Sequence, residues 1–274
     1  MSTKYVFLDI DGTLVGADGR VPESAVEAIR RARENGHKIF ICSGRCRCEM
    51  HENILCVPLD GIVGSAGAYV EIDGRVIFHR SMTEEMNARL LDYFLSRGMA
   101  ILLETNGELY GNAMAIRYMQ ENADYCEANG LPYDKPLYDL VQPLADVQEP
   151  AKLAVNKLIY ITKKYDPEEV RRDLGEEFTV VDSAIDMPGN SGEVSEKGMH
   201  KGVGIETAIR HYGADMADTI GIGDGENDMG MLRACAVGIA MGNANPILKE
   251  IADYETSAVG ENGIKNAFMH YGLI

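Results

Sequence analysis

Residues 4–15 read KYVFLDIDGTLV, and this stretch decides the fold. Tyr5–Leu8 is a short apolar run without polar alternation, which is typical of a strand buried on both faces of a parallel sheet. Asp9 and Asp11 follow where this strand ends, separated by one residue. An isolated Asp-x-Asp-Gly is most often a solvated turn. Its meaning here therefore depends on what the rest of the chain brings beside it.

A helix and a second apolar strand come next. Pro22 opens a segment whose apolar residues recur at helical spacing, and Gly36 suits its end. Lys38–Cys42 is again apolar. The β-α-β order predicts parallel strands joined by a right-handed crossover. The same alternation returns with a helix at Lys201–Tyr212 and a strand at Thr219–Ile222, so we expect a doubly wound, Rossmann-like α/β core.

The order of predicted strands and helices changes in the middle of the chain. Between residues 83 and 189, strand-like segments such as Ala100–Glu104 and Lys157–Thr162 alternate with helical spacing in no βαβ order. We interpret 83–189 as an α+β domain inserted into a core made of residues 1–82 and 190–274.

Composition excludes several classes of protein. The formal net charge is −17, which opposes nucleic-acid binding because phosphate contacts need lysine and arginine. No run of about 18 apolar residues occurs, so no membrane span is expected. The N-terminus shows no basic segment followed by an apolar signal core, which favours a cytoplasmic location. The oligomeric state is left open.

Six cysteines raise the question of a metal site. Cys46-x-Cys48 with His51 nearby is suggestive, but the spacing fits no usual zinc pattern and no second ligand pair follows. Packed, reduced thiols are the favoured interpretation. The cysteines stand at positions 42, 46, 48, 56, 126 and 235.

Polar clusters follow three of the predicted core strands, and a fourth precedes the helix that begins near Lys201. Parallel strands end at one edge of a sheet, where ligands of open α/β sheets bind. Carboxylates that converge there repel one another unless a cation joins them, and several oxygen donors beside a lysine suit Mg²⁺. The clusters are Asp9-x-Asp11-x-Thr13, Ser43-Gly44-Arg45, Lys197-Gly-x-x-Lys201-Gly and Gly223-Asp224-Gly-Glu-Asn227-Asp228.

In this order, with the insertion between the second and third, the clusters resemble the four motifs of haloacid-dehalogenase-type phosphatases. The later Gly238-Ile-Ala-Met-Gly-Asn243-Ala is similar to the Cof-type branch, which carries an α/β cap of the C2B class. The resemblance implies a haloacid-dehalogenase core, an inserted cap and a phosphatase. The substrate would be a small phosphorylated metabolite, such as a sugar phosphate.

The resemblance also implies roles. Asp9 would attack phosphorus and form an aspartyl-phosphate, and Asp11 would protonate the leaving oxygen and later deprotonate water. Lys197 would neutralise charge on Asp9 and on the phosphoryl group. Ser43 and the N–H of Gly44 would hold phosphate oxygens, and Asn227 would orient the phosphate.

The roles of two basic residues are less specific. Arg45 either touches substrate or pairs with a carboxylate, and Lys201 is interpreted as a helix-surface charge. For the metal, the family pattern implies Mg²⁺ bound by Asp9, the backbone carbonyl of Asp11, and Asp224. Asp228 would bind it directly or through water.

Two departures from the family pattern concern the loops. Ser43 stands where threonine is commoner, which preserves the hydroxyl. Ala66 lies in a stretch where many relatives carry Asn-Gly, which puts the implied substrate range in doubt. The insertion is expected to cover the site, and its candidate substrate contacts are Glu104, Asn106, Arg117 and Asn190.

Three alternative functions fit the sequence less well. A phosphomutase of the phosphomannomutase type would need cap arginines for a second phosphate, but residues 83–189 hold twenty acidic and only ten basic residues. A phosphate- or Mg²⁺-binding protein without turnover would have no use for the Asp9/Asp11 pair. A dinucleotide fold would need glycine where Glu226 follows Gly221-x-Gly223, and a carboxylate there repels pyrophosphate.

Overall fold

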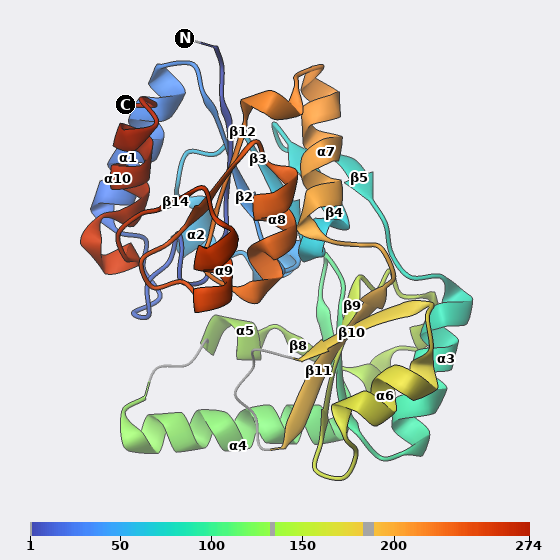
Figure 1. Ribbon diagram of the computed structural model, residues 1–274. Helices are drawn as coiled ribbons and strands as arrows, with labels where there is room; N and C mark the ends of the chain where they lie inside the picture. Colours follow the sequence, from blue (N-terminus) through green and yellow to red (C-terminus); the bar gives the residue numbers. More distant parts are fainter. Residues whose placement is uncertain (1, 132–134, 183–188) are drawn as a thin grey trace. The chain divides into compact units, whose positions relative to one another are not determined.

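The computed structural model describes residues 2–131, 135–182 and 189–274, and the chain divides into two compact units (Figure 1). Unit 1, the core, comprises Met1–Arg45, Met50–His79 and His200–Ile274. Unit 2, the inserted unit, comprises Arg80–Met199 together with the short segment Cys46–Glu49.

Unit 1 is built on an eight-stranded sheet. The strand order is β14-β13-β12-β1-β2-β3-β4-β5, parallel from β14 to β3, with β4 and β5 added antiparallel. The strands are β1 (Tyr5–Leu8), β2 (Lys38–Cys42), β3 (Gly61–Gly64), β4 (Tyr69–Ile72), β5 (Arg75–His79), β12 (Thr219–Gly223), β13 (Val237–Ala240) and β14 (Tyr254–Glu255). The helices are α1 (Glu23–Glu34), α2 (Glu52–Leu55), α7 (Lys201–Tyr212), α8 (Met229–Ala234), α9 (Pro246–Ile251) and α10 (Gly263–His270).

The core sheet is covered on both faces. Helices α1 and α10 pack together on one face, while α7 and α8 pack together on the other (Figure 1). Val6, Phe7 and Leu8 of β1 are completely buried, as expected for a central strand that lies between two helical layers. This arrangement confirms the predicted doubly wound α/β core.

Unit 2 has a six-stranded sheet of its own, in the order β10-β11-β9-β6-β7-β8. Neighbouring strands are antiparallel except β7 and β8. The strands are β6 (Ala100–Glu104), β7 (Leu109–Gly111), β8 (Val141–Pro143), β9 (Lys157–Thr162), β10 (Phe178–Asp182) and β11 (Asn190–Glu196). The helices are α3 (Glu84–Ser96), α4 (Ala113–Asn129), α5 (Lys135–Asp139) and α6 (Pro167–Leu174), and the 3₁₀ turn η1 spans Arg47–Glu49.

Strand alternation divides the side chains of this second sheet between two apolar layers. In β6, Ile101 and Leu103 join the cluster formed with α3 and α6, whereas Ala100 and Leu102 join the cluster formed with α4. The two helical layers lie on opposite faces of the sheet (Figure 1). Unit 2 therefore has a core that is separate from that of unit 1.

The structure shifts both predicted boundaries of the insertion. The first moves only slightly, from residue 83 to Arg80. The second moves from 189 to Met199, because β11 pairs with β9 and β10 and so belongs to the second sheet. Arg80 and Glu196 also form a two-bond ion pair within unit 2, with Nε 2.9 Å from Oε2.

Two further features concern the character of the helices and the state of the cysteines. Within residues 2–131, 135–182 and 189–274, none of the helices has both the length and the apolar character of a membrane span. All six cysteines are free thiols, and four of them are buried.

Candidate active site

Asp9 and Asp224 lie at the carboxyl ends of adjacent parallel strands. The register pairs Leu8 of β1 with Ile222 of β12, and the Asp9 N–H donates a hydrogen bond to the Ile222 carbonyl at 3.0 Å. Strand β1 ends at Leu8 and β12 ends at Gly223, so both strands end beside this hydrogen bond. The ladder of the sheet therefore brings the first and fourth motifs together, as the sequence predicted.

A buried lysine lies between two of the carboxylates. The Nζ of Lys201 donates to Oδ1 of Asp9 at 2.6 Å and to Oδ1 of Asp228. All three side chains are almost completely buried. Lys201 is the first residue of α7, and its backbone follows the extended His200. The start of this helix thus delivers an ammonium group to the end of β1.

The assignment of Lys197 as this lysine is therefore corrected. Its side chain is 59 % exposed, and its ammonium lies 3.6 Å from Glu176, within unit 2. The interpretation of Lys201 as a surface charge was also wrong. The reason is local: Lys197 follows the last strand of the second sheet, whereas Lys201 lies on the buried stripe of α7 with Ile205 and Ala208.

Asp228 organises the loop that carries Asp224. Its Oδ2 accepts hydrogen bonds from the backbone N–H groups of Asp224 at 2.9 Å and Gly225 at 3.0 Å, while Oδ1 faces Lys201. A Cβ on Gly223 would lie 2.4 Å from the Asp228 carboxyl carbon, so glycine is required there. Asp228 is completely buried and fixes both the loop and the lysine.

Asp224 is held by the first motif. Thr13 Oγ1 donates to its Oδ1 at 3.0 Å, and Gly12 approaches so closely that a Cβ would lie 2.1 Å from Oδ2. Asn243 Nδ2 donates to the Gly12 carbonyl at 2.8 Å and lies 3.4 Å from Asp224 Oδ2. The positioning roles of Thr13 and Asn243 were not predicted. Both stood in quoted motifs, which was the available signal.

The charge balance of the cluster favours a cation. Burial, and then the charge of Asp228, raises the pKa of Asp9 to about 7 although Lys201 acts to lower it. Burial likewise raises the pKa of Asp224 to about 6. Burial alone would lower the pKa of Lys201, but Asp228 and Asp9 outweigh it and raise the value. The positive charge of Lys201 thus stands against the negative charges of Asp9, Asp224 and Asp228.

The donor set fits a hard divalent cation. Asp9, Asp224 and Asp228 each offer an oxygen, and these atoms lie within 4.8 Å of one another. Only oxygen donors take part, which is the preference of Mg²⁺. A dication would stabilise the charged carboxylates of Asp9 and Asp224 against the burial, and then the mutual repulsion, that raise their pKa values.

Asp11 is held by the second motif rather than by the lysine. Its carboxylate accepts hydrogen bonds from Arg45, with Nε at 2.9 Å and Nη2 at 2.8 Å. The side chain of Asp11 is 59 % exposed and that of Arg45 is 23 % exposed. Of the two roles left open for Arg45, the structure contains the carboxylate pair.

The remaining predicted phosphate ligands line the same end of the sheet. Ser43 follows β2, is buried, and its Oγ accepts a hydrogen bond from the Arg45 N–H at 3.2 Å. A Cβ on Gly44 would meet no atom within 4 Å, so its backbone borders open space. Asn227 is exposed, and its Oδ1 would lie 2.5 Å from a Cβ on Gly225. Ala66 adopts left-handed geometry at φ 52°, a conformation that asparagine tolerates better.

The candidate substrate contacts in unit 2 have structural partners. Asn106 accepts a hydrogen bond from the Arg47 N–H at 3.0 Å and donates to Asn156 at 2.9 Å. Arg117 lies on the exposed side of α4, 3.7 Å from Glu121. Asn190 donates to the Tyr165 carbonyl at 2.9 Å. Glu104 is buried at the end of β6.

Comparison with known proteins agrees with this geometry. The family model described as haloacid dehalogenase-like hydrolase matches residues 6–268. YkrA of Bacillus subtilis is 28 % identical over the full length of both chains. The phosphoglycolate phosphatase of Methanothermobacter thermautotrophicus is 26 % identical, and the match covers 98 % of each chain.

Solved structures give the same result. A protein of Geobacillus kaustophilus superimposes with a TM-score of 0.82 at 26 % identity, covering 100 % of both chains. A sugar phosphatase of subclass IIB of the same superfamily superimposes with a TM-score of 0.78 at 27 % identity, covering 99 % of this chain and 100 % of that one. The Rossmann-like core and the inserted unit are therefore features of a known fold.

Proposed function

The chain belongs to the haloacid dehalogenase-like hydrolases, and we propose that it is a Mg²⁺-dependent phosphatase of small phosphomonoesters that acts through an aspartyl-phosphate on Asp9. The observation that carries the proposal is the buried arrangement of Asp9 with Lys201 at 2.6 Å and the oxygens of Asp224 and Asp228 within 4.8 Å. Phosphoryl transfer depends mainly on such positioning and on neutralisation of negative charge.

In the first step, an oxygen of Asp9 attacks phosphorus, and the bond to the ester oxygen breaks. Asp11 supplies the proton that the departing alkoxide takes up. In the second step, Asp11 removes a proton from water as that water attacks the phosphorus of the acyl phosphate on Asp9, and the bond between phosphorus and the Asp9 oxygen breaks. Free phosphate leaves, and Asp9 is regenerated. Lys201 stays protonated throughout and balances charge beside Asp9.

The ion pair between Asp11 and Arg45 bears on the timing of these steps. Arg45 donates a hydrogen bond to each carboxylate oxygen of Asp11, so both oxygens are engaged by the guanidinium. Asp11 must therefore leave Arg45 before it protonates the leaving oxygen. A guanidinium released in this way is free to bind the incoming phosphoryl group.

Mg²⁺ would be held by Asp9 and Asp224, with Asp228 beside them, and it would supply positive charge to the phosphoryl oxygens. Ser43 and the Gly44 N–H would hold the remaining phosphate oxygens, and Asn227 would orient the phosphate. The names of relatives that act on phosphoglycolate and on sugar phosphates support a small, anionic substrate.

The test is a panel of phosphomonoesters assayed for phosphate release with Mg²⁺ or with EDTA, using wild type, Asp9→Asn and Asp11→Asn. We expect metal-dependent turnover that falls at least about 10³-fold in each variant. Only Asp11→Asn should accept phosphate on Asp9 from an ester with a good leaving group, which mass spectrometry detects as a phosphorylated chain.

Three results would overturn the proposal. Intact turnover in both variants would remove the assigned roles. Isomerised product that depends on a bisphosphate activator would indicate a phosphomutase. Metal binding without turnover on any ester would indicate a binding protein.

A further inference from the structure

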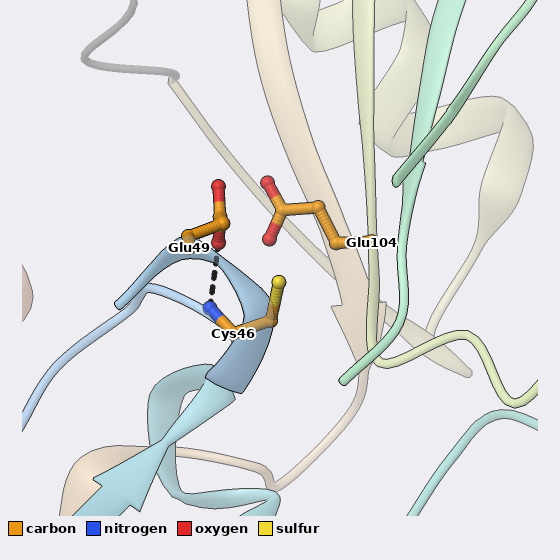
Figure 2. A group of neighbouring side chains, drawn as sticks. All are labelled: Cys46, Glu49 and Glu104. Atoms are coloured by element: carbon orange, nitrogen blue, oxygen red, sulfur yellow. Dashed lines mark hydrogen bonds between the residues drawn. The ribbon is translucent and has the colours of Figure 1, made fainter. Parts of the chain in front are cut away.

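A second group of metal-binding side chains lies in unit 2. Cys46 and Glu49 belong to the segment containing η1, and Glu104 ends β6. The Cys46 thiol and the two carboxylates each place a donor atom within 4.8 Å of the others, and all three residues are buried. Figure 2 shows the two carboxylates facing each other, with the Cys46 sulfur directed toward Glu104.

Glu104 has an oxygen that lacks a hydrogen-bond donor in the part of the chain that the structure describes. Its Oε2 is buried and accepts no hydrogen bond, although Lys157 Nζ lies 3.2 Å away. The same ammonium lies 3.0 Å from Glu193, so it is shared. A buried carboxylate that shares one ammonium with a second carboxylate is only partly neutralised, and coordination to a cation would stabilise it.

A cavity of about 60 Å³ borders both carboxylates. A water molecule needs roughly 10–15 Å³ of such space, so an ion with a bound water can be accommodated. The other walls are mainly apolar, including Leu102, Leu109 and Ile159. Among the described residues, Glu49 and Glu104 are the charged groups that line this cavity, and the Cys46 thiol lies within 4.8 Å of their carboxylate oxygens.

The donors differ in kind from those around Asp9. A thiol beside two carboxylates suits a borderline cation such as Zn²⁺, whereas Mg²⁺ prefers oxygen alone. Cys48 lies outside this donor group: its Sγ is 3.4 Å from that of Cys46 and donates to the Thr105 carbonyl at 3.4 Å. Three protein ligands with water in the fourth position are the usual arrangement of an open tetrahedral zinc site.

We propose that Cys46, Glu49 and Glu104 form a zinc site in unit 2, made of different residues from the Asp9 cluster, with water as the fourth ligand. Zinc binding replaces the Cys46 thiol proton by a metal–sulfur bond and releases that proton to solvent, with no change of oxidation state. His51, the partner suggested by the sequence, is not in the donor group; Glu104, which is distant in sequence, takes that place.

The test uses the full chain, kept reduced and freed of metal, titrated with Co²⁺ as a spectroscopic substitute for Zn²⁺. We expect a thiolate-to-cobalt charge-transfer band that saturates at one equivalent and disappears when Zn²⁺ is added. Cys46→Ser should abolish the band, and Glu104→Gln should weaken Co²⁺ binding at least about tenfold. Cys126→Ser, which removes another buried thiol of unit 2, should keep it.

Two controls separate this site from the Mg²⁺ site and from misfolding. Asp224→Asn should retain the band, because the Asp9 cluster offers only oxygen. Circular dichroism checks the fold of each variant. If Cys46→Ser does not fold, Glu104→Gln still decides, since it should weaken Co²⁺ binding at least about tenfold. Absence of a thiolate band, its persistence in Cys46→Ser, or unchanged Co²⁺ affinity in Glu104→Gln would each overturn the proposal.

Discussion

Lys201 keeps its charge while buried because two carboxylates surround it. Removing a buried lysine that has polar partners leaves those partners unpaired, with a typical cost of about 3–5 kcal/mol. The same side chain is the cation nearest to the proposed nucleophile, at 2.6 Å. Its loss should therefore affect both turnover and stability.

The first prediction compares the two lysines of the third motif. Lys201→Met should lower turnover at least about 10²-fold, because a fixed positive charge beside the reacting group is lost. Lys197→Met should stay within about twofold of wild type, since its ammonium is exposed beside Glu176. Steady-state kinetics on one phosphomonoester measures both, with circular dichroism as the check on folding. The reverse ranking would restore the assignment made from the sequence.

The two lysines also show which parts of the site could be predicted from the sequence. The motif contains two Lys-Gly pairs, and order along the chain does not choose between them. Helical spacing does, because Lys201 shares its stripe with Ile205 and Ala208. Asp9, Asp224 and Ser43 were predictable because parallel strands must end at one edge. The proximity of Cys46 to Glu104 was not, since the two residues are distant in sequence and no strand pair or helical spacing links them.

Asp60 provides a pH-dependent prediction. It is buried and accepts hydrogen bonds from Arg33 at 2.8 Å, Lys38 at 2.9 Å and the Ile39 N–H at 3.0 Å. Burial alone would raise the pKa of Asp60, but these donors outweigh it and lower the value. A lowered pKa in the folded state means that the carboxylate stabilises the protein at neutral pH and stops doing so in acid.

Asp60→Asn should therefore reduce the free energy of unfolding by about 2–4 kcal/mol at pH 7. The difference from wild type should persist down to about pH 4, the value for an unfolded aspartate, and shrink as the pH falls further toward the lowered pKa. Urea unfolding across this range measures it. Asp218→Asn, which removes an exposed partner of Lys4, should have little effect. A difference that grows in acid would contradict the argument.

The loop between β1 and α1 depends on close backbone approach. Gly12 and Gly19 both have left-handed backbone geometry, with φ of 79° and 73°. Only Gly12 lies against a side chain, because a Cβ there would fall 2.1 Å from Asp224 Oδ2, whereas a Cβ on Gly19 would meet nothing within 4 Å. The two positions thus separate backbone strain from displacement of Asp224, the proposed metal ligand.

Gly12→Ala should lower the apparent affinity for Mg²⁺ at least about tenfold, because the methyl group displaces Asp224. Gly19→Ala should cost only the left-handed penalty, about 1–2 kcal/mol of stability, and keep Mg²⁺ affinity. Titration of activity with Mg²⁺ and thermal unfolding measure the two effects. Equal losses of affinity would show that strain alone is responsible.

Strand β11 illustrates an element that the sequence could not place. Its residues NSGEVSE contain a single large apolar side chain, Val194, and read as a polar connection. Pairing on both sides, with β9 and β10, is what makes it a strand. Strongly apolar strands such as β1, β2 and β9 matched their predicted bounds because burial on both faces leaves a continuous apolar run.

Two separate apolar cores imply two cooperative units. Phe268 is fully buried in the core of unit 1, and Phe94 is fully buried in unit 2, stacked 5.1 Å from Tyr160 between ring centroids. Replacing either ring by alanine should cost about 3–5 kcal/mol. Since the clusters share no members, each loss should fall on its own unit.

We therefore expect scanning calorimetry of the full chain to resolve two transitions. Phe94→Ala should lower the transition temperature of one and Phe268→Ala that of the other. A single transition that both variants lower equally would show that the chain unfolds as one unit.

The ion pair between Arg80 and Glu196 has a consequence for the history of the chain. Arg80 opens the inserted segment and Glu196 ends its last strand, so the pair holds the two ends of the insertion side by side. Closing a loop costs entropy that grows with its length when the ends are free. Here the folded insertion itself holds its two ends together. The closure entropy is therefore not borne by unit 1, and it does not depend on how long the inserted segment is. An insertion of different length or sequence could therefore replace this one without disturbing the Asp9 cluster of unit 1.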